Sequence, residues 1–132
     1  MEAFRWHVYV CTQQKPGEIP SCTRRGSEVV LEKLREEVNK RGLMNEVHIT
    51  TCGSLGLCEH GPNMVVYPEG VWYSGVQPEE VPEIVEQHFQ NGTVVERLAW
   101  QDAGELRKTI LDTIAKMRAA MGLLTPTAAK PR

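Results

Sequence analysis

Hydrophobic residues recur along this chain with two periods, and each period predicts one kind of element. Alternating apolar and polar residues predict short strands at residues 4–10 and 46–50. Two short apolar runs, at residues 64–67 and 71–73, flank the turn residues Pro68, Glu69 and Gly70 and predict a hairpin of two strands. Apolar residues spaced three and four positions apart predict helices at residues 28–41, 78–90 and 103–121. Residues 93–98 suit either a short edge strand or an extended linker. The chain is therefore expected to mix strands with helices.

The residues that flank each periodic stretch predict where the helices begin and end. Ser27 is expected to cap the first helix with its hydroxyl oxygen, and Gly42 is expected to end it. Pro82 is compatible with the second helix because it lies in the first turn, where N–H groups have no intrahelical partner. Asp102 and Glu105 are spaced as a capping pair before the last helix.

The order of these elements indicates an α/β fold, a small mixed β-sheet with flanking helices and one right-handed crossover between the first two strands. We expect this domain to span residues 1–98 and a C-terminal helical extension to span residues 99–124. Residues 125–132 are rich in Pro, Ala and Thr and are expected to form a disordered tail.

Composition and charge narrow the class of protein. The chain has 132 residues, of which 41% are hydrophobic and 24% charged, as in ordinary soluble globular proteins. Its net charge of −2 lacks the basic footprint of a nucleic-acid binder, and it has no apolar run long enough to span a membrane. The N-terminal residues have no apolar signal region, so a cytoplasmic location with reduced thiols is expected.

Four cysteines carry the most informative chemistry, and they are Cys11, Cys22, Cys52 and Cys58. The intervening segments have ten, 29 and five residues, which is neither the paired spacing of zinc ribbons nor a thioredoxin-type CxxC motif. Four soft thiolate ligands suit an iron–sulfur cluster. The alternative is that some of these cysteines are buried and serve as small hydrophobic residues.

The predicted fold gives these cysteines a common location. Cys11 ends the first strand, and Cys52 and Cys58 lie in a loop that also contains Gly53, Gly56 and Gly61. Glycines let backbone N–H groups approach a bound group closely. Because loops that leave one edge of a sheet converge there, we expect the thiols to meet at one end of the molecule.

Three blocks of sequence resemble the thioredoxin-like [2Fe–2S] ferredoxins, also called Shethna-type ferredoxins. They are residues 61–76 (GPNMVVYPEGVWYSGV), residues 8–11 (VYVC), and Cys22 with the following Arg24, Arg25 and Gly26. The resemblance covers residues 4–98. It implies a thioredoxin-like fold, a [2Fe–2S] cluster, and a one-electron carrier that is not an enzyme. It also implies redox partner proteins and often a homodimer.

The resemblance implies three cluster ligands by position and leaves the fourth open. Cys11, Cys22 and Cys58 match the family's ligands. The family usually leaves three residues between its last two ligands, which here points to Ser54 rather than Cys52. Iron prefers thiolate to the oxygen of serine, which favours Cys52 with a repacked loop, and Ser54 is the alternative. A third alternative is a site that no longer holds a cluster.

Further residues have a functional and a purely structural interpretation. Arg24 and Arg25 either offset cluster charge or line a solvated helix start. A run of four glutamates either steers a basic partner or forms a solvated face: Glu79, Glu80, Glu83 and Glu86. Trp72 and Tyr73 suit either an interface or the core of the sheet. His60 follows Cys58 closely, but a Rieske centre needs two histidines, so this interpretation is rejected.

Two other functions compete with the electron carrier. A thiol–disulfide oxidoreductase on the same fold needs two thiols within reach of each other, one with a lowered pKa. A redox-sensing or iron-sensing module would use the C-terminal amphipathic helix to recruit another protein, because the apolar stripe of that helix must be buried against something.

Overall fold

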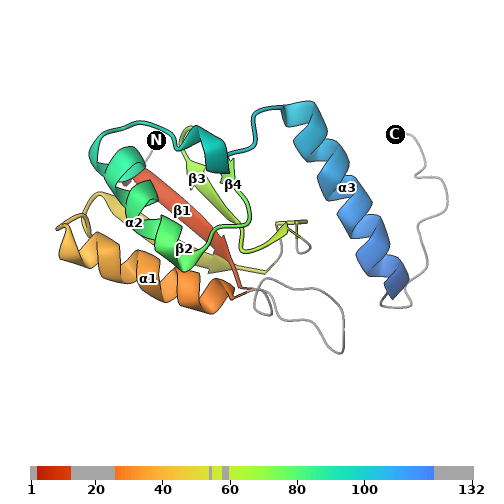
Figure 1. Ribbon diagram of the computed structural model, residues 1–132, viewed down its shortest axis with the longest axis horizontal. Helices are drawn as coiled ribbons and strands as arrows, with labels where there is room; N and C mark the ends of the chain where they lie inside the picture. The colour runs from red at the N-terminus through yellow and green to blue at the C-terminus, as the bar shows by residue number, and fades with distance from the viewer. Residues whose placement is uncertain (1–2, 13–25, 54, 58–59, 121–132) are drawn as a thin grey trace.

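The structure is a computed structural model of the whole chain, and it describes residues 3–12, 26–53, 55–57 and 60–120 (Figure 1). The predicted loop at residues 12–21 lies almost wholly outside these ranges, as does the predicted tail at residues 125–132.

The described residues form a four-stranded mixed sheet with the order β2-β1-β3-β4. The strands are β1 (Trp6–Cys11), β2 (Val47–Cys52), β3 (Met64–Tyr67) and β4 (Val71–Tyr73). β1 pairs with β2 in parallel and with β3 in antiparallel fashion, and β3 and β4 form an antiparallel hairpin. The predicted mixed sheet is confirmed, and β2 runs two residues further than the alternating pattern indicated, as far as Cys52.

Helices complete the predicted order along the chain. Helix α1 (Ser27–Lys40) lies between β1 and β2 in the sequence, as a parallel pair requires. Three short helical segments follow β4 in succession, namely η2 (Pro78–Glu80), α2 (Val81–Ile84) and η3 (Val85–Gln90). The turn η4 (Glu96–Leu98) and the long helix α3 (Ala103–Ala120) end the described chain.

The core lies between the sheet and a single layer of helices, formed by α1 and α2–η3, which cover the same face of the sheet (Figure 1). Val8 and Val10 of β1 are fully buried against Leu34 of α1 and Ile84 of α2. Alternate residues of β1 point to the other face and are half-exposed, as the period of a strand requires. This packing fixes β1 in the middle of the sheet and with it the direction in which its last residue emerges.

The predicted N-cap of α1 is wrong. Ser27 is the first helical residue, and Gly26 precedes it with a left-handed backbone at φ 92°. A β-carbon is disfavoured at that backbone angle, so the N-cap position is occupied by glycine and not by Ser27, to which the sequence pattern assigned it. The Ser27 hydroxyl is instead buried and has no hydrogen-bond partner among the described residues.

The predicted helix at residues 78–90 has the right bounds but not one helical type. It begins as a 3-10 turn, continues for one α-helical turn and ends as a π-helix, in which Asn91 N–H donates to the Glu86 carbonyl oxygen at 3.1 Å. The apolar spacing of the sequence does not distinguish these helical types, because all of them bring residues three and four apart to nearly the same face.

Helix α3 is confirmed where the periodicity predicts it. The Asp102 carboxylate accepts hydrogen bonds from the N–H groups of Gly104 at 2.7 Å and Glu105 at 3.1 Å, which confirms Asp102 as its cap. Figure 1 shows α3 standing beside the sheet, apart from the helices that cover its face. Among the described residues, no helix has the length and apolar character needed to cross a membrane.

Candidate metal centre

Two of the four candidate ligands lie side by side at one edge of the sheet. Cys11 is the last residue of β1 and Cys52 the last residue of β2, and the parallel register pairs these two residues directly. Both carry thiols. The carboxyl ends of adjacent parallel strands meet at one edge, so the fold itself brings together two cysteines that are far apart in the sequence. This confirms the expected meeting of these two thiols.

The environment of the two thiols is apolar and closely packed. Cys11 is fully buried and packs against Cys52 and Leu55, and its thiol donates a hydrogen bond to the Gly53 carbonyl oxygen at 3.0 Å. Burial raises the pKa of the Cys52 thiol, and the neighbouring Cys11 raises it further. A metal bound to both sulfurs would stabilise them as thiolates, because its positive charge offsets the repulsion between the two negative sulfurs.

The segment after Cys52 is shaped by one residue whose role the sequence did not indicate. Asn63 is almost fully buried just before β3, and its side-chain amide donates to the Leu57 carbonyl oxygen at 2.7 Å. The backbone carbonyl oxygen of Asn63 accepts a hydrogen bond from Cys11 N–H at 3.2 Å. Asn63 therefore ties the loop and the end of β1 together. Its place in the GPN block of the family resemblance was the available signal.

The glycines of this segment serve different purposes. Gly56 has a left-handed backbone, at φ +79°, and is buried. Gly53 is exposed and has open space where a β-carbon would stand. A thiol pair in an apolar setting fits a group bound through sulfur. Cys22, Cys58 and the alternative ligand Ser54 lie outside the described residues, as do Arg24 and Arg25.

Two of the four histidines are neighbours, because His7 and His48 are register partners whose ring centroids lie 4.8 Å apart. His7 lies on β1, His48 on β2 and His88 in η3. The ring of His60 stands edge-on to Trp100, with 6.2 Å between the ring centroids.

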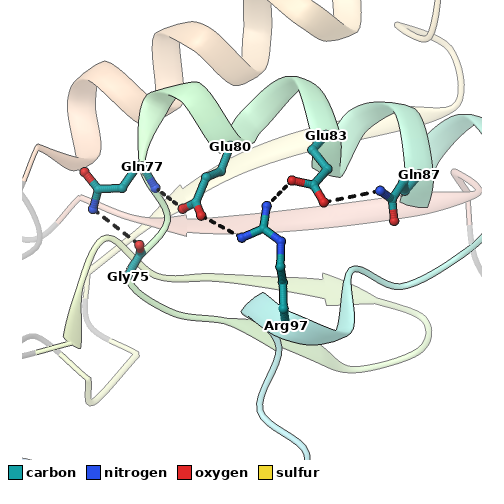
Figure 2. Close-up of polar contacts among 6 residues, drawn as sticks. All are labelled: Gly75, Gln77, Glu80, Glu83, Gln87 and Arg97. Atoms are coloured by element: carbon teal, nitrogen blue, oxygen red, sulfur yellow. Dashed lines mark hydrogen bonds and ion pairs between the residues drawn. The ribbon is translucent and has the colours of Figure 1, made fainter.

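The acidic run on the helices after β4 is partly neutralised by a basic residue from another segment. Arg97 pairs with Glu80 at 3.0 Å and with Glu83, as Figure 2 shows. Gln87 donates to the other oxygen of Glu83 at 3.2 Å, and Gln77 N–H donates to Glu80 at 2.9 Å. The glutamates facing Arg97 therefore hold η4 against the helix. Of the four glutamates in this run, Glu79 and Glu86 remain available to attract a basic partner.

The aromatic pair of β4 divides between core and surface. Tyr73 is fully buried, and its hydroxyl accepts from Val95 N–H at 3.1 Å. Trp72 is half-exposed on the opposite face of the sheet. Only Trp72 of the two is therefore available for an interface.

Comparison with known proteins places the chain in a family, although no family model matches it. It is 43% identical over 94 residues to a 2Fe-2S ferredoxin of Clostridium pasteurianum, covering 70% of this chain and 92% of that protein. It is 45% identical over 95 residues to a 2Fe-2S ferredoxin of Aquifex aeolicus, covering 70% of this chain and 86% of that protein. The crystal structure of the thioredoxin-like [2Fe-2S] ferredoxin from Aquifex aeolicus superimposes with a TM-score of 0.70 at 42% identity, covering 76% of this chain and 100% of that chain.

This chain belongs to the thioredoxin-like [2Fe–2S] ferredoxins. The predicted family and thioredoxin-like fold are confirmed. Ferredoxins are electron-transfer proteins rather than enzymes, and they work with redox partner proteins.

Proposed function

We propose that this ferredoxin carries one electron at a time on a [2Fe–2S] cluster held by the thiolates of Cys11, Cys22, Cys52 and Cys58. The observation that carries the proposal is the register pairing of Cys11 with Cys52 at the ends of two parallel strands. Such a cluster cycles between two oxidation states that differ by one electron and needs no proton transfer from the protein. The chain's own task is to supply thiolates, backbone N–H groups and an apolar wall.

Cys52 is the fourth ligand in this proposal, with Ser54 as the alternative. The Cys52 thiol already packs against Cys11, and its sulfur is softer than a serine oxygen. Solved structures of the Aquifex ferredoxin include two cysteine-to-serine variants, at positions separated as Ser54 and Cys58 are here. Each superimposes on this chain with a TM-score of 0.69, so serine at either position is compatible with this fold.

Purification without oxygen, followed by iron and sulfide analysis, tests the proposed function. We expect two irons and two sulfides per chain. We also expect a visible spectrum that bleaches on reduction by one electron. A colourless chain that binds neither iron nor sulfide after reconstitution would contradict the proposal.

The thiol–disulfide oxidoreductase is the second candidate, because Cys11 and Cys52 are neighbours. A thiol enzyme needs an exposed sulfur with a lowered pKa. Cys11 is fully buried, and the pKa of Cys52 is raised. These properties favour the electron carrier over the thiol enzyme.

We further propose a homodimer that forms through the face of the sheet opposite α1. Side chains on this face line a shallow depression of about 490 Å³: His7, Tyr9, Leu55, Val65, Tyr67 and Trp72. Aromatic side chains of this kind are enriched in protein interfaces. Tyr67 is 40% exposed, so its aromatic ring is available for contact with a second copy of the chain.

Sedimentation analysis of the loaded protein tests the dimer. Tyr67→Glu should convert it to a monomer, because a charge would be buried in the interface. Met44→Glu is the matched control, since Met44 is an exposed apolar residue outside this face. A monomeric wild-type protein, or equal behaviour of the two variants, would contradict the dimer.

The domain organisation and location complete the proposal. We propose a ferredoxin domain at residues 1–98, a helical extension at residues 99–124 and a tail at residues 125–132. Limited proteolysis with mass analysis of the fragments checks these boundaries. We also propose a cytoplasmic location, because thiols stay reduced there, and cell fractionation checks it.

A further inference from the structure

Helix α3 is joined to the sheet by a segment that is itself fixed to β4. Trp100 N–H donates to the Trp72 carbonyl oxygen at 2.9 Å, and the indole N–H of Trp100 donates to the Ser74 hydroxyl oxygen at 2.7 Å. Ala99 forms an antiparallel bridge with Tyr73. The helix therefore starts from a defined point at the edge of the sheet.

The same segment contacts the loop between β2 and β3. The His60 ring lies edge-on to Trp100, and the His60 carbonyl oxygen accepts a hydrogen bond from Gly75 N–H at 2.7 Å. His60 N–H in turn donates to the Leu57 carbonyl oxygen at 2.8 Å. The start of the extension and the second half of the loop are thus held together.

The middle of α3 meets the first half of the loop at Gly56. A β-carbon at Gly56 would stand 2.6 Å from Cγ2 of Ile110, closer than such atoms approach in proteins. The Ile110 side chain therefore occupies the space in which any side chain at position 56 would lie. Gly56 and Leu57 are both buried. The loop that links Cys52 to Cys58 is thus shaped to receive this helix.

The two sides of α3 differ in the way that such a contact requires. On the side of Ile110, Thr113 is only 3% exposed and Ile114 is half-buried. On the other side, Leu111 is 52% exposed and Asp112 is exposed. The helix therefore presents a fixed side to the loop.

The Aquifex ferredoxin superimposes along its whole length and leaves about a quarter of this chain unmatched, since 76% is covered. The sheet and its covering helices make up the shared fold, and we assign the unmatched part chiefly to the region of α3.

We propose that α3 is a fixed wall on the cluster-binding loop and that Ile110 is the positioning residue that seats it. The inference rests on the proposed cluster ligands. By covering Gly56, Ile110 keeps water from the loop and holds its N–H groups in place. Both effects change the stability of the reduced cluster, because water stabilises the additional negative charge that this cluster carries.

Ile110→Ala and Leu111→Ala form a matched pair of variants of the full chain. Both shorten an aliphatic side chain to alanine in the same helix, but only Ile110 contacts the loop. In the loaded protein, Ile110→Ala should release iron to a chelator several-fold faster than wild type and shift the reduction potential to a more positive value. It should also increase hydrogen exchange of residues 55–62. Leu111→Ala should match wild type in all of these measurements.

The outcomes separate this inference from the proposed function. If wild type loads a cluster and Ile110→Ala behaves like Leu111→Ala, the role of α3 is overturned while the electron carrier stands. If no cluster loads in wild type, the proposed function fails. The exchange comparison then still shows whether Ile110 holds the loop.

Gly56→Ala provides a second route that does not depend on truncating α3. The added methyl group meets Ile110, so Gly56→Ala alone should accelerate iron release. Ile110→Ala in the same chain should recover part of that loss, because it removes the atom that the methyl group meets. If the double variant releases iron as fast as Gly56→Ala, or faster, the proposed contact is contradicted.

Discussion

The two ends of β1 satisfy their buried polar groups in opposite ways. At the amino end, Trp6 and His88 donate to the same carboxylate oxygen of Glu69, at 3.0 and 2.7 Å. Behind them, Tyr73 meets the other ring nitrogen of His88 at 2.8 Å. At the carboxyl end, the Cys11 and Cys52 side chains pack together with Leu55, and the Cys11 thiol donates to the Gly53 carbonyl oxygen. One end is complete within the chain, whereas the other is suited to receive a group from outside it.

The proton positions in the amino-end network follow from its partners. Val95 N–H donates to the Tyr73 oxygen, so the Tyr73 hydroxyl proton is directed to Nδ1 of His88. Nε2 of His88 then carries a proton to donate to Glu69. Burial and the charge of Glu69 raise the pKa of Tyr73 to about 12, although the bond from Val95 opposes this. The amino end of β1 thus contributes to stability, whereas the carboxyl end carries the proposed site.

The largest expected effect is at the carboxyl end. Cys52→Ala should abolish the stable [2Fe–2S] cluster, because one of four thiolates is lost, while the fold remains. Iron and sulfide counts and the visible spectrum measure the effect. Ser54→Ala is the matched control and should load normally. A normal cluster in Cys52→Ala together with its loss in Ser54→Ala would assign the fourth ligand to Ser54.

The next effect is at the amino end and concerns stability alone. Tyr73→Phe removes one hydroxyl group and leaves Val95 N–H and His88 Nδ1 buried without it. We expect a loss of about 2 kcal/mol in the free energy of unfolding. Urea denaturation measures this loss, and the cluster spectrum should stay unchanged. A changed spectrum with unaltered stability would show that the two ends are not separate in this way.

A smaller effect concerns pH and lies on α1, away from both ends. Burial alone would raise the pKa of Glu37, but the hydrogen bond from Arg41 and the charges of Lys40, Arg41 and Lys33 outweigh it and lower the pKa. A carboxylate with a lowered pKa contributes stability above its unfolded pKa, and this contribution is lost as the pH falls through its folded value.

Glu37→Gln should therefore lose stability relative to wild type at about pH 7, and the difference should shrink only as the pH falls below about 4, through the lowered folded pKa. Urea denaturation across this range measures it. Glu36→Gln is the control, because the Glu36 side chain is 62% exposed and its ion pair with Lys33 is long, at 3.7 Å. A pH-independent difference for Glu37→Gln would refute the assignment.

The smallest effect is expected at Arg97. Its ion pairs with Glu80 and Glu83 are exposed, and water and salt screen them (Figure 2). Arg97→Gln should lower the unfolding midpoint slightly, and less so at high salt. Arg107→Gln, an exposed arginine on α3, provides the comparison. A large loss for Arg97→Gln would mean that η4 is a more central support of the fold than its exposure indicates.

The sequence predicted the elements whose signals are local. The alternation in β1 and the spacing of Val30, Leu34 and Val38 in α1 reflect burial on one face, so they correspond directly to the observed core. The start of α1 was predicted wrongly because serine is a common cap, whereas the backbone angle at Gly26 decides the matter. The helical types within residues 78–90 depend on hydrogen-bond register, which apolar spacing does not record.

The site was predictable only in part, because its geometry depends on contacts distant in sequence. Cysteine counting and strand ends predicted that Cys11 and Cys52 meet. The bond from Asn63 to Leu57 and the seat of Ile110 on Gly56 join segments that no local pattern relates. An asparagine before a strand and an isoleucine in an amphipathic helix carry no signal of such roles by themselves.

The parallel pairing of β1 with β2 has a consequence for the order of assembly. Cys11 and Cys52 become neighbours only after α1 has formed the crossover and both strands have docked. An unfolded chain does not hold these two sulfurs together, so we expect the cluster to load after the first half of the molecule has folded. In this respect the protein differs from small zinc domains, in which the metal itself drives the chain to fold.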